Sequence, residues 1–488
     1  METSIVDDVP RVATPVNLPL TVPSGSAPLR HRIAEAIVEQ IRLGRLGIGD
    51  ALPSSRTLAA ELRVARGGVV EAYDELAASG FVVAVPGSAT RIAPGADVAA
   101  RAHAQSHSVE PATVVPPRQR TRVEPVIADL RPGRPDTSLI AESAWRRAWR
   151  RAASAAPAAG GSDLAAHPEL RSALAVHLRR TRGIDVVPEE LVILPGVAAA
   201  MRVLAVAAGL DGRDVAFEDP GYHRARRALV TEGARIRPVP VDSDGLPPRL
   251  LVDTDAAVYC TPAHQYPMGA RMSVARRAEL VARANAVGML VIEDDYDGEF
   301  RYDVSALPAL RSIDGGRECV AYIGTASKIL SPMLRLAWLI PPDPLHPRVG
   351  EAIAECGESA NEMSALALAT LIDDGSLTRH LARTARTYRA RRAAFVDALR
   401  LRLADLEGVQ VVGIEAGLHV VLRLPTGIDD TAVVAAAEQC GVRTTPVSAQ
   451  LAGAGGLRGL VCGYACLPES TAGEVAGVIA DAVRQVVD

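Results

Sequence analysis

The sequence predicts an α/β protein with a small helical domain, completed by a β-hairpin, and a large domain built on a mainly parallel sheet. The chain has 488 residues, and a single hydrophobic core usually stops growing at roughly 250–300 residues. Near the N-terminus isoleucines recur at helical spacing, and beyond residue 126 helical patterns alternate with short apolar runs. These observations predict at least two domains of different architecture.

The composition excludes several classes of protein. Hydrophobic residues make up 48% of the chain and charged residues 23%, with a net charge of −4, so the chain is neither a disordered acidic segment nor a wholly basic nucleic-acid coat. No apolar run is long enough to cross a bilayer, and the first residues lack the pattern of a signal peptide. We therefore expect a soluble, cytoplasmic protein. The six cysteines form no CxxC pair, which favours neither a disulfide framework nor a metal site.

The N-terminal segment changes character near residue 27. Residues 1–26 contain four prolines between positions 10 and 23, too close together for a helix to persist, and are interpreted as a flexible tail. From there the pattern becomes helical, with an apolar residue at every fourth position from Leu29 to Ile41 and glycines from Gly44 onward. A first helix is predicted between these points.

Two further helices and a hairpin complete a domain that ends at residue 93. The stretch 54–62 carries a helix-capping signal, and a tight turn at 63–66 leads into a third helix that Gly80 ends. Residues 81–85 and 90–92, on either side of a turn at 86–88, are interpreted as a β-hairpin. This order of elements is the winged helix-turn-helix plan, which presents a helix to the major groove of DNA.

Residues 27–92 resemble the GntR-type DNA-binding domain. The resemblance rests on the runs 49–59, 64–66 and 87–90. It implies that Arg56 begins the second helix, that Arg66 begins the recognition helix, and that Gly87 lies at the tip of the wing. The residues that it assigns to DNA are Ser54, Ser55, Arg56, Arg66, Gly87 and Thr90.

The chain departs from this family at Gly67, Gly68 and Ala89, which leaves the recognition of bases at those positions open. The alternative is a helical protein-interaction module on which Arg56 and Arg66 are solvated surface charges. Residues 27–93 contain eight arginines against seven acidic residues, a small positive excess. Binding to double-stranded DNA would then need a second copy, which favours a dimer that contacts two half-sites.

Residues 94–125 are interpreted as a linker, because Ala, Pro, Arg, Gln, Ser and His dominate and no periodicity is sustained. In residues 126–488, helical patterns such as 170–178 and 197–208 alternate with apolar runs. The runs are residues 191–194, 215–217, 256–260, 289–292, 320–323 and 337–340. This alternation predicts βαβ units around a mainly parallel sheet, in which ligands bind at the carboxyl ends of the strands.

Polar residues follow three of these predicted strands, at 261–269, 293–300 and 324–328. The last of these segments ends with Lys328, the single lysine among the 53 basic residues of the chain. Arginine can replace lysine in solvation and ion pairing, but it cannot form a Schiff base. Because every other basic residue counted is an arginine, we predict a chemical role for Lys328.

The groups at the strand ends are those that hold pyridoxal 5′-phosphate: an amine for the aldehyde, a carboxylate for the ring nitrogen, and hydroxyls with an arginine for the phosphate. Taken singly, Asp294 also fits a solvated turn and Tyr222 a core aromatic. From about residue 126 to its end, the chain resembles the aspartate aminotransferase-like fold (fold type I). By that resemblance Lys328 forms the Schiff base, Asp294 binds the ring nitrogen, Tyr296 the ring oxygen, Tyr222 stacks on the ring, and Thr325, Ser327, Arg335 and Gly196 surround the phosphate.

A GntR-type domain, a long linker and an aminotransferase-like body in one chain resemble the MocR/GabR-like regulators. The resemblance implies a transcriptional regulator that forms a head-to-tail homodimer, in which a small-molecule effector changes the spacing of the two DNA-binding heads. The effector would be pyridoxal phosphate itself, as in relatives that control vitamin B6 synthesis, or an amino acid or amine that reacts with it. The alternative from another class is an active aminotransferase with a DNA-binding appendage.

Two departures from the aminotransferase pattern favour sensing over turnover. Val461 stands where free-standing enzymes carry an arginine that binds the substrate α-carboxylate, and Arg458 or Arg443 would have to compensate from another register. Pro195 replaces a hydroxyl residue at the helix start expected to bind the phosphate, where backbone N–H groups can still serve. We therefore expect the aminotransferase-like domain to act as a sensor and not as an enzyme.

Overall fold

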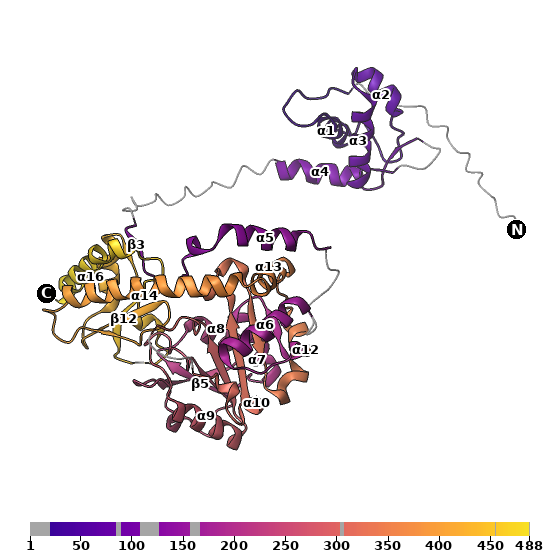
Figure 1. Cartoon of the computed structure of the whole chain (residues 1–488). Coiled ribbons are helices and arrows are strands. Elements are labelled where there is room, and N and C mark those ends of the chain that lie inside the picture. Colours follow the sequence, from indigo (N-terminus) through magenta and orange to yellow (C-terminus); the bar gives the residue numbers. More distant parts are fainter. Residues whose placement is uncertain are drawn as a thin grey trace. The chain divides into compact units, whose positions relative to one another are not determined.

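A computed structural model describes residues 20–83, 89–107, 126–156, 166–302, 307–453 and 455–487. The chain divides into two compact units, Met1–Arg122 and Val123–Asp488 (Figure 1). The small unit consists of helices and a two-stranded hairpin, and the large unit is built on a seven-stranded sheet. The predicted fold class is confirmed.

In the small unit the helices and the hairpin follow one another as the sequence predicts. They are α1 (Leu29–Arg42), α2 (Ser55–Leu62), α3 (Arg66–Ala78) and the antiparallel pair β1 (Val82–Val83) and β2 (Arg91–Ile92). Ser54 caps α2, because its side-chain oxygen accepts a hydrogen bond from the backbone N–H of Thr57 at 3.1 Å. Arg63 ends α2 in the left-handed conformation, which turns the chain sharply into α3.

The core of the small unit is one apolar cluster between these helices. The apolar residues at every fourth position form the buried face of α1 and pack with Leu58 of α2 and Val69 of α3. Leu20 and Val22 also pack against this cluster, although the sequence assigns them to the flexible tail 1–26. Residues 1–19 of that tail lie outside the described residues.

A fourth helix, α4 (Ala96–His107), lies inside the segment 94–125 that the sequence analysis interprets as a linker. Ala96 and Ala100 are buried in the core of the small unit, where α4 packs against α1. The interpretation as a linker is therefore wrong for residues 96–107. Two alanines one turn apart anchor the helix, and such small side chains give too weak a periodicity to be recognised. Residues 108–125 lie outside the described part of the chain.

The seven-stranded sheet of the large unit has the order β4-β10-β9-β8-β7-β5-β6. Its strands are β4 (Val192–Leu194), β5 (Asp214–Asp219), β6 (Arg235–Pro240), β7 (Ala257–Cys260), β8 (Leu290–Asp295), β9 (Val320–Thr325) and β10 (Ala337–Ile340). Six of them are the predicted apolar runs. Neighbours from β6 to β9 are parallel, whereas β10 is antiparallel to β9 and β4. The unpredicted β6 carries two prolines, which a sheet tolerates at its edge.

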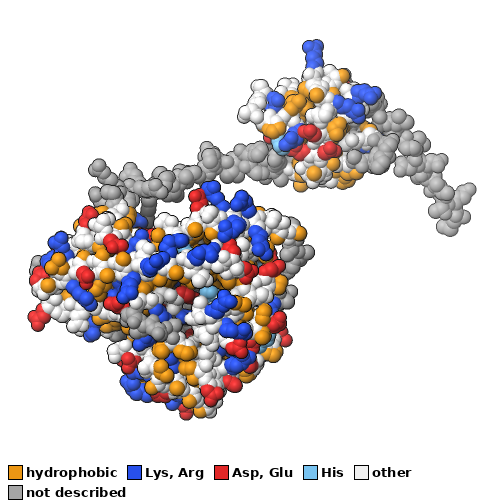
Figure 2. Space-filling model, in the orientation of Figure 1, with side chains coloured by type: hydrophobic (Ala, Val, Ile, Leu, Met, Phe, Trp, Pro, Cys, Tyr) orange, Lys and Arg blue, Asp and Glu red, His pale blue; other side chains and the backbone are white. Residues whose placement is uncertain are grey.

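Helices cover both faces of this sheet. On one face an apolar cluster contains α7 (Val197–Ala208), α8 (His223–Thr231) and α12 (His346–Cys356). The other face is covered by α9 (Val274–Val287), α6 (Pro168–Arg182) and α13 (Glu362–Asp373). Helix α5 (Glu142–Ala153) packs along α13, and Figure 2 shows basic side chains gathered over it. Two short helices, α10 (Gly316–Cys319) and α11 (Ala326–Ile329), flank β9.

A second sheet, which the apolar runs do not predict, forms the C-terminal part of the large unit. Its antiparallel strands are β11 (Gln410–Val412), β12 (His419–Leu424), β15 (Arg458–Gly463) and β14 (Thr445–Pro446), in that order. It is accompanied by α14 (Ser376–Arg402), α15 (Asp430–Gln439) and α16 (Ala472–Val487), while β3 (Ala128–Asp129) pairs with β13 (Val442–Arg443). No helix within the described residues is long and apolar enough to cross a membrane.

Candidate functional site

The carboxyl ends of β7, β8 and β9 border a cavity of about 210 Å³ in the large unit. Parallel strands end at the same edge of a sheet, so residues far apart in the chain meet here. All eight residues that the sequence predicts for the cofactor line this cavity: Gly196, Tyr222, Asp294, Tyr296, Thr325, Ser327, Lys328 and Arg335. The structure thus brings the whole predicted set together, while the role of each residue stays a prediction.

Lys328 lies on α11, directly after β9. Thr325 caps this helix, since its side-chain oxygen accepts a hydrogen bond from the backbone N–H of Ser327 at 3.1 Å. Nζ of Lys328 donates a hydrogen bond of 2.8 Å to the carbonyl oxygen of Gly133. Burial lowers the pKa of Lys328 from its usual value, and the charge of Asp294 opposes this shift. A lowered pKa favours the neutral amine, the form that attacks an aldehyde.

Asp294, near the end of β8, is buried, and only one of its two carboxylate oxygens has a hydrogen-bond partner among the described residues. Its Oδ2 accepts a hydrogen bond of 2.8 Å from the hydroxyl of Tyr259. Its Oδ1 has no hydrogen-bond partner among the described residues. Burial raises the pKa of Asp294 to about 7. A buried carboxylate oxygen without a partner needs a donor, and a protonated pyridine nitrogen would supply one.

One part of the cavity wall suits an anion. Gly196 caps α7 with a φ of 124°, a conformation that glycine adopts readily, and the first residues of α7 line the cavity. The free N–H groups of a helix start bind phosphate. Arg224, Arg335 and Ser327 also line the wall. The hydroxyl of Thr325, in contrast, donates to the carbonyl oxygen of Leu336 at 3.1 Å, so it is engaged within the protein.

Three tyrosines form an aromatic wall. The ring of Tyr266 packs edge to face against those of Tyr222 and Tyr296, with centroids 5.7 and 5.9 Å apart. All three line the cavity. Such a wall fits a flat aromatic ligand.

The cavity residues without a predicted role include Arg224, Tyr259, Tyr266 and His419. Arg224 lies two residues after Tyr222, and Tyr266 lies in the segment that follows β7, so their distance from strand ends could have identified them. His419 begins β12 in the second sheet. No local pattern indicates that it reaches the cavity.

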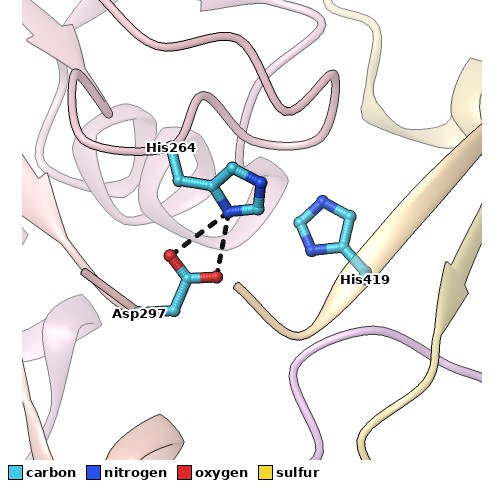
Figure 3. A group of neighbouring side chains, drawn as sticks. All are labelled: His264, Asp297 and His419. Carbon is cyan, nitrogen blue, oxygen red and sulfur yellow. Dashed lines mark hydrogen bonds and ion pairs between the residues drawn. The ribbon is translucent and has the colours of Figure 1, made fainter. Parts of the chain in front are cut away.

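His264, Asp297 and His419 form a buried group of polar side chains (Figure 3). Nδ1 of His264 lies 3.0 Å from Oδ2 of Asp297, and Nε2 of His419 donates to the carbonyl oxygen of Pro267 at 2.9 Å. The atoms that could bind a metal lie within 4.8 Å of one another. In this structure the group is joined to the protein by hydrogen bonds, with one nitrogen of each histidine engaged.

The position of the missing carboxylate-binding arginine lies within β15. Val461 is fully buried there in a small apolar cluster. Arg443 and Arg458, which could have replaced the missing arginine, do not line the cavity. Arg443 pairs with Glu438, and Arg458 donates to backbone carbonyl oxygens. The basic residues in the wall, as far as the chain is described, are Arg224, Lys328 and Arg335.

In the small unit, four of the six predicted DNA-binding residues lie at the starts of α2 and α3: Ser54, Ser55, Arg56 and Arg66. Arg56 and Arg66 are exposed near the starts of the two helices. Nε of Arg66 donates to the hydroxyl of Ser55 at 3.3 Å, which joins the two helix starts. Ser54 caps α2, and the remaining two are Thr90, which lies next to β2, and Gly87, which lies outside the described residues.

Comparison with known proteins agrees with both halves of this architecture. Residues 29–92 match the family of bacterial regulatory proteins of the GntR type, and residues 133–479 match aminotransferase class I and II. The pyridoxine biosynthesis transcriptional regulator PdxR of Corynebacterium glutamicum is 34% identical over 96% of this chain and 99% of its own length. The probable rhizopine catabolism regulatory protein MocR of Rhizobium meliloti is 31% identical over 91% of each chain. This chain belongs to the MocR family of transcriptional regulators.

Solved structures resemble the large unit of this MocR-family regulator. An archaeal alanine:glyoxylate aminotransferase superposes with a TM-score of 0.69 at 24% identity, covering 75% of this chain and 92% of that chain. A multiple substrate aminotransferase from Thermococcus profundus gives a TM-score of 0.67 at 25% identity, covering 74% and 91%. The predicted fold type I domain is thereby confirmed. Domains of this class typically bind pyridoxal phosphate, whereas the curated relatives above are named as regulators.

Proposed function

We propose that this MocR-family regulator binds pyridoxal 5′-phosphate through Lys328 and that the bound cofactor changes its binding to DNA. The observation that carries the proposal is the meeting, in one cavity, of the single lysine with the unpartnered Oδ1 of Asp294. Lys328 supplies an amine for the aldehyde and Asp294 a partner for the ring nitrogen. The start of α7, with Arg224 and Arg335, supplies a site for the phosphate.

The cavity favours pyridoxal phosphate itself as the signal. Once Arg224 and Arg335 bind the phosphate, the described wall holds no further guanidinium for the α-carboxylate of an amino acid. Val461, which stands at the position of the missing arginine, is apolar and cannot bind a carboxylate. The relative from Corynebacterium glutamicum is named for pyridoxine biosynthesis. We infer that this chain controls vitamin B6 synthesis in response to pyridoxal phosphate.

The DNA-binding form that we propose is a head-to-tail homodimer with one small unit on each half-site. The exposed Arg56 and Arg66 at neighbouring helix starts fit a contact with one half-site. The small positive excess of residues 27–93 gives one copy little electrostatic affinity. Two linked copies would bind far more tightly than either alone.

Footprinting of the full-length protein upstream of its own gene, with and without pyridoxal phosphate, tests this function. We expect the cofactor to change the protected region or the affinity. The variant Lys328→Ala should bind the same DNA and lose the response. Identical protection of the wild-type protein under both conditions would contradict the proposal.

An active aminotransferase with a DNA-binding appendage is the second candidate, favoured by the complete set of Lys328, Asp294 and Tyr222 in the cavity. Mixing the cofactor-loaded protein with amino acids and an oxo-acid acceptor separates the possibilities. Multiple turnovers would support the enzyme. A single change of the visible absorbance would support a sensor of a cofactor–amine adduct, and no change would support a sensor of pyridoxal phosphate itself.

A further inference from the structure

Tyr296 lines the cavity, and its hydroxyl oxygen lies 3.1 Å from Nδ1 of the buried His264. The same nitrogen lies 3.0 Å from Oδ2 of Asp297, a contact that Figure 3 shows as a dashed line. The side chains of His264 and Asp297 are 2% and 1% exposed. One ring nitrogen therefore faces a hydroxyl and a carboxylate at once, away from solvent.

The carboxylate of Asp297 determines which atoms carry hydrogen in the group of Asp297, His264 and Tyr296. An ionised carboxylate can only accept hydrogen bonds, and a lone pair on Nδ1 of His264 would repel it. Nδ1 therefore carries a hydrogen and donates it to Asp297. The hydroxyl of Tyr296 then finds no lone pair on Nδ1, so its own hydrogen is free to serve another acceptor.

Tyr296 keeps that hydrogen across the physiological range. Burial raises the pKa of Tyr296 well above its usual value, and the charge of Asp297 raises it further. Burial also lowers the pKa of His419 to about 4, so that this neighbour is neutral near pH 7. The other titratable groups that face this region are Glu218 on β5, Tyr266 after β7, Asp294 on β8 and Lys328 on α11.

We propose that Asp297 and His264 are positioning residues that keep the hydrogen of the Tyr296 hydroxyl available to the ring oxygen of bound pyridoxal phosphate. The proposal rests on the proposed function, because it needs the cofactor in the cavity. A hydrogen bond from the Tyr296 hydroxyl would stabilise the ionised form of the ring oxygen. Asp297 and His264 would thus set the pH at which the visible absorbance of the bound cofactor changes, without touching the cofactor.

The test is a pH titration of the visible absorbance of the cofactor-loaded, full-length protein. Asp297→Asn keeps the size of the side chain, but its amide can donate to Nδ1 of His264. The other tautomer is then favoured, and Nδ1 becomes an acceptor for the Tyr296 hydroxyl. We expect the midpoint of the titration to rise by about one pH unit, the effect of one net hydrogen bond. Tyr296→Phe, which removes the donor, should raise the midpoint at least as far.

A double variant distinguishes positioning from a direct effect of charge. Asp297→Asn combined with Tyr296→Phe should titrate like Tyr296→Phe alone, because Asp297 acts through the hydroxyl. Additive shifts, or no shift in Asp297→Asn, would overturn the proposal. If Asp297→Asn fails to fold, His264→Gln decides: a rise supports the proposal, and an unchanged midpoint overturns it.

Asp430→Asn is the matched control. Asp430 is fully buried and accepts hydrogen bonds from Ser448 and Gly459, outside the cavity wall. It should leave the midpoint unchanged, and a similar rise in this variant would overturn the proposal. If the wild-type protein forms no visible band with pyridoxal phosphate, the proposed function fails together with this inference. A wild-type band with an unshifted Asp297→Asn overturns the inference alone.

Discussion

Nζ of Lys328 lies 2.8 Å from the carbonyl oxygen of Gly133, a residue without a side chain. Gly133 has a φ of 76°, and a Cβ atom added to it would lie 2.4 Å from Nζ. The backbone conformation favours glycine, and an added Cβ atom would displace the amine of Lys328. Pro132 and Gly133 line the cavity, and the carbonyl oxygen of Gly133 holds the lysine amine by a hydrogen bond.

Gly133→Ala should displace the amine of Lys328 and weaken the binding of pyridoxal phosphate at least about tenfold, a loss of roughly 1.4 kcal/mol. Titration of the visible absorbance with the cofactor measures this. Gly288→Ala is the matched control, because Gly288 has a φ of 70° and open space around the added Cβ. It should cost a similar backbone strain and leave cofactor affinity intact. An equal loss of affinity in both variants would contradict the account.

Asp294→Asn should stabilise the cofactor-free protein at high pH. The folded-state pKa of Asp294 is raised to about 7 from 3.8, so its stabilising contribution is present below about pH 4 and is lost as the pH rises through 7. At pH 8 the wild-type protein therefore carries a buried charge that the amide lacks, worth at most about 4 kcal/mol. Melting temperatures without cofactor should differ most at pH 8 and least near pH 4. A difference that does not depend on pH would contradict the assignment.

The same variant should respond differently to the cofactor. Saturating pyridoxal phosphate should raise the melting temperature of the wild-type protein, because a ligand that binds only the folded state stabilises it. The amide of Asp294→Asn offers no charge to a protonated ring nitrogen, so its melting temperature should rise much less. Equal stabilisation of both proteins would count against a contact between Asp294 and the ring.

Arg66→Ala should weaken binding to the operator by about 1–3 kcal/mol and reduce its sequence preference, because Arg66 lies exposed at the start of α3. Fluorescence anisotropy on specific and scrambled DNA measures both effects. Arg45→Ala, in the turn after α1, removes another exposed arginine and should leave the preference unchanged. Cofactor absorbance should be the same in both variants, and a strong change of it would argue against independent domains.

Local signals in the sequence predict most of the elements that position the site. The hydroxyl of Ser54 indicates the start of α2, and apolar runs indicate six of the seven strands of the large sheet. Apolar patterns in the sequence do not predict helix α4, because Ala96 and Ala100 bury little apolar surface. They do not predict strand β6 either, because it contains prolines and arginines. Both depend on contacts with distant parts of the chain.

The cavity shows the same limit. Lys328 and Asp294 are predictable, because each lies just beyond a predicted apolar run and Lys328 is the single lysine of the chain. The roles of His264 and His419 depend on the meeting of a loop after β7 with a strand of the second sheet. No spacing along the sequence encodes that meeting. The hydrogen-bonded group behind Tyr296 is therefore visible only in three dimensions.

The central claim is that the amine of Lys328 binds pyridoxal phosphate covalently, and reduction of the cofactor-loaded protein with borohydride tests it most directly. Digestion and mass spectrometry should then find one pyridoxyl group, on the peptide that contains Lys328. The variant Lys328→Ala should show no visible band and no label, with its basal DNA binding retained. A labelled wild-type protein whose Lys328 peptide is unmodified would contradict the account.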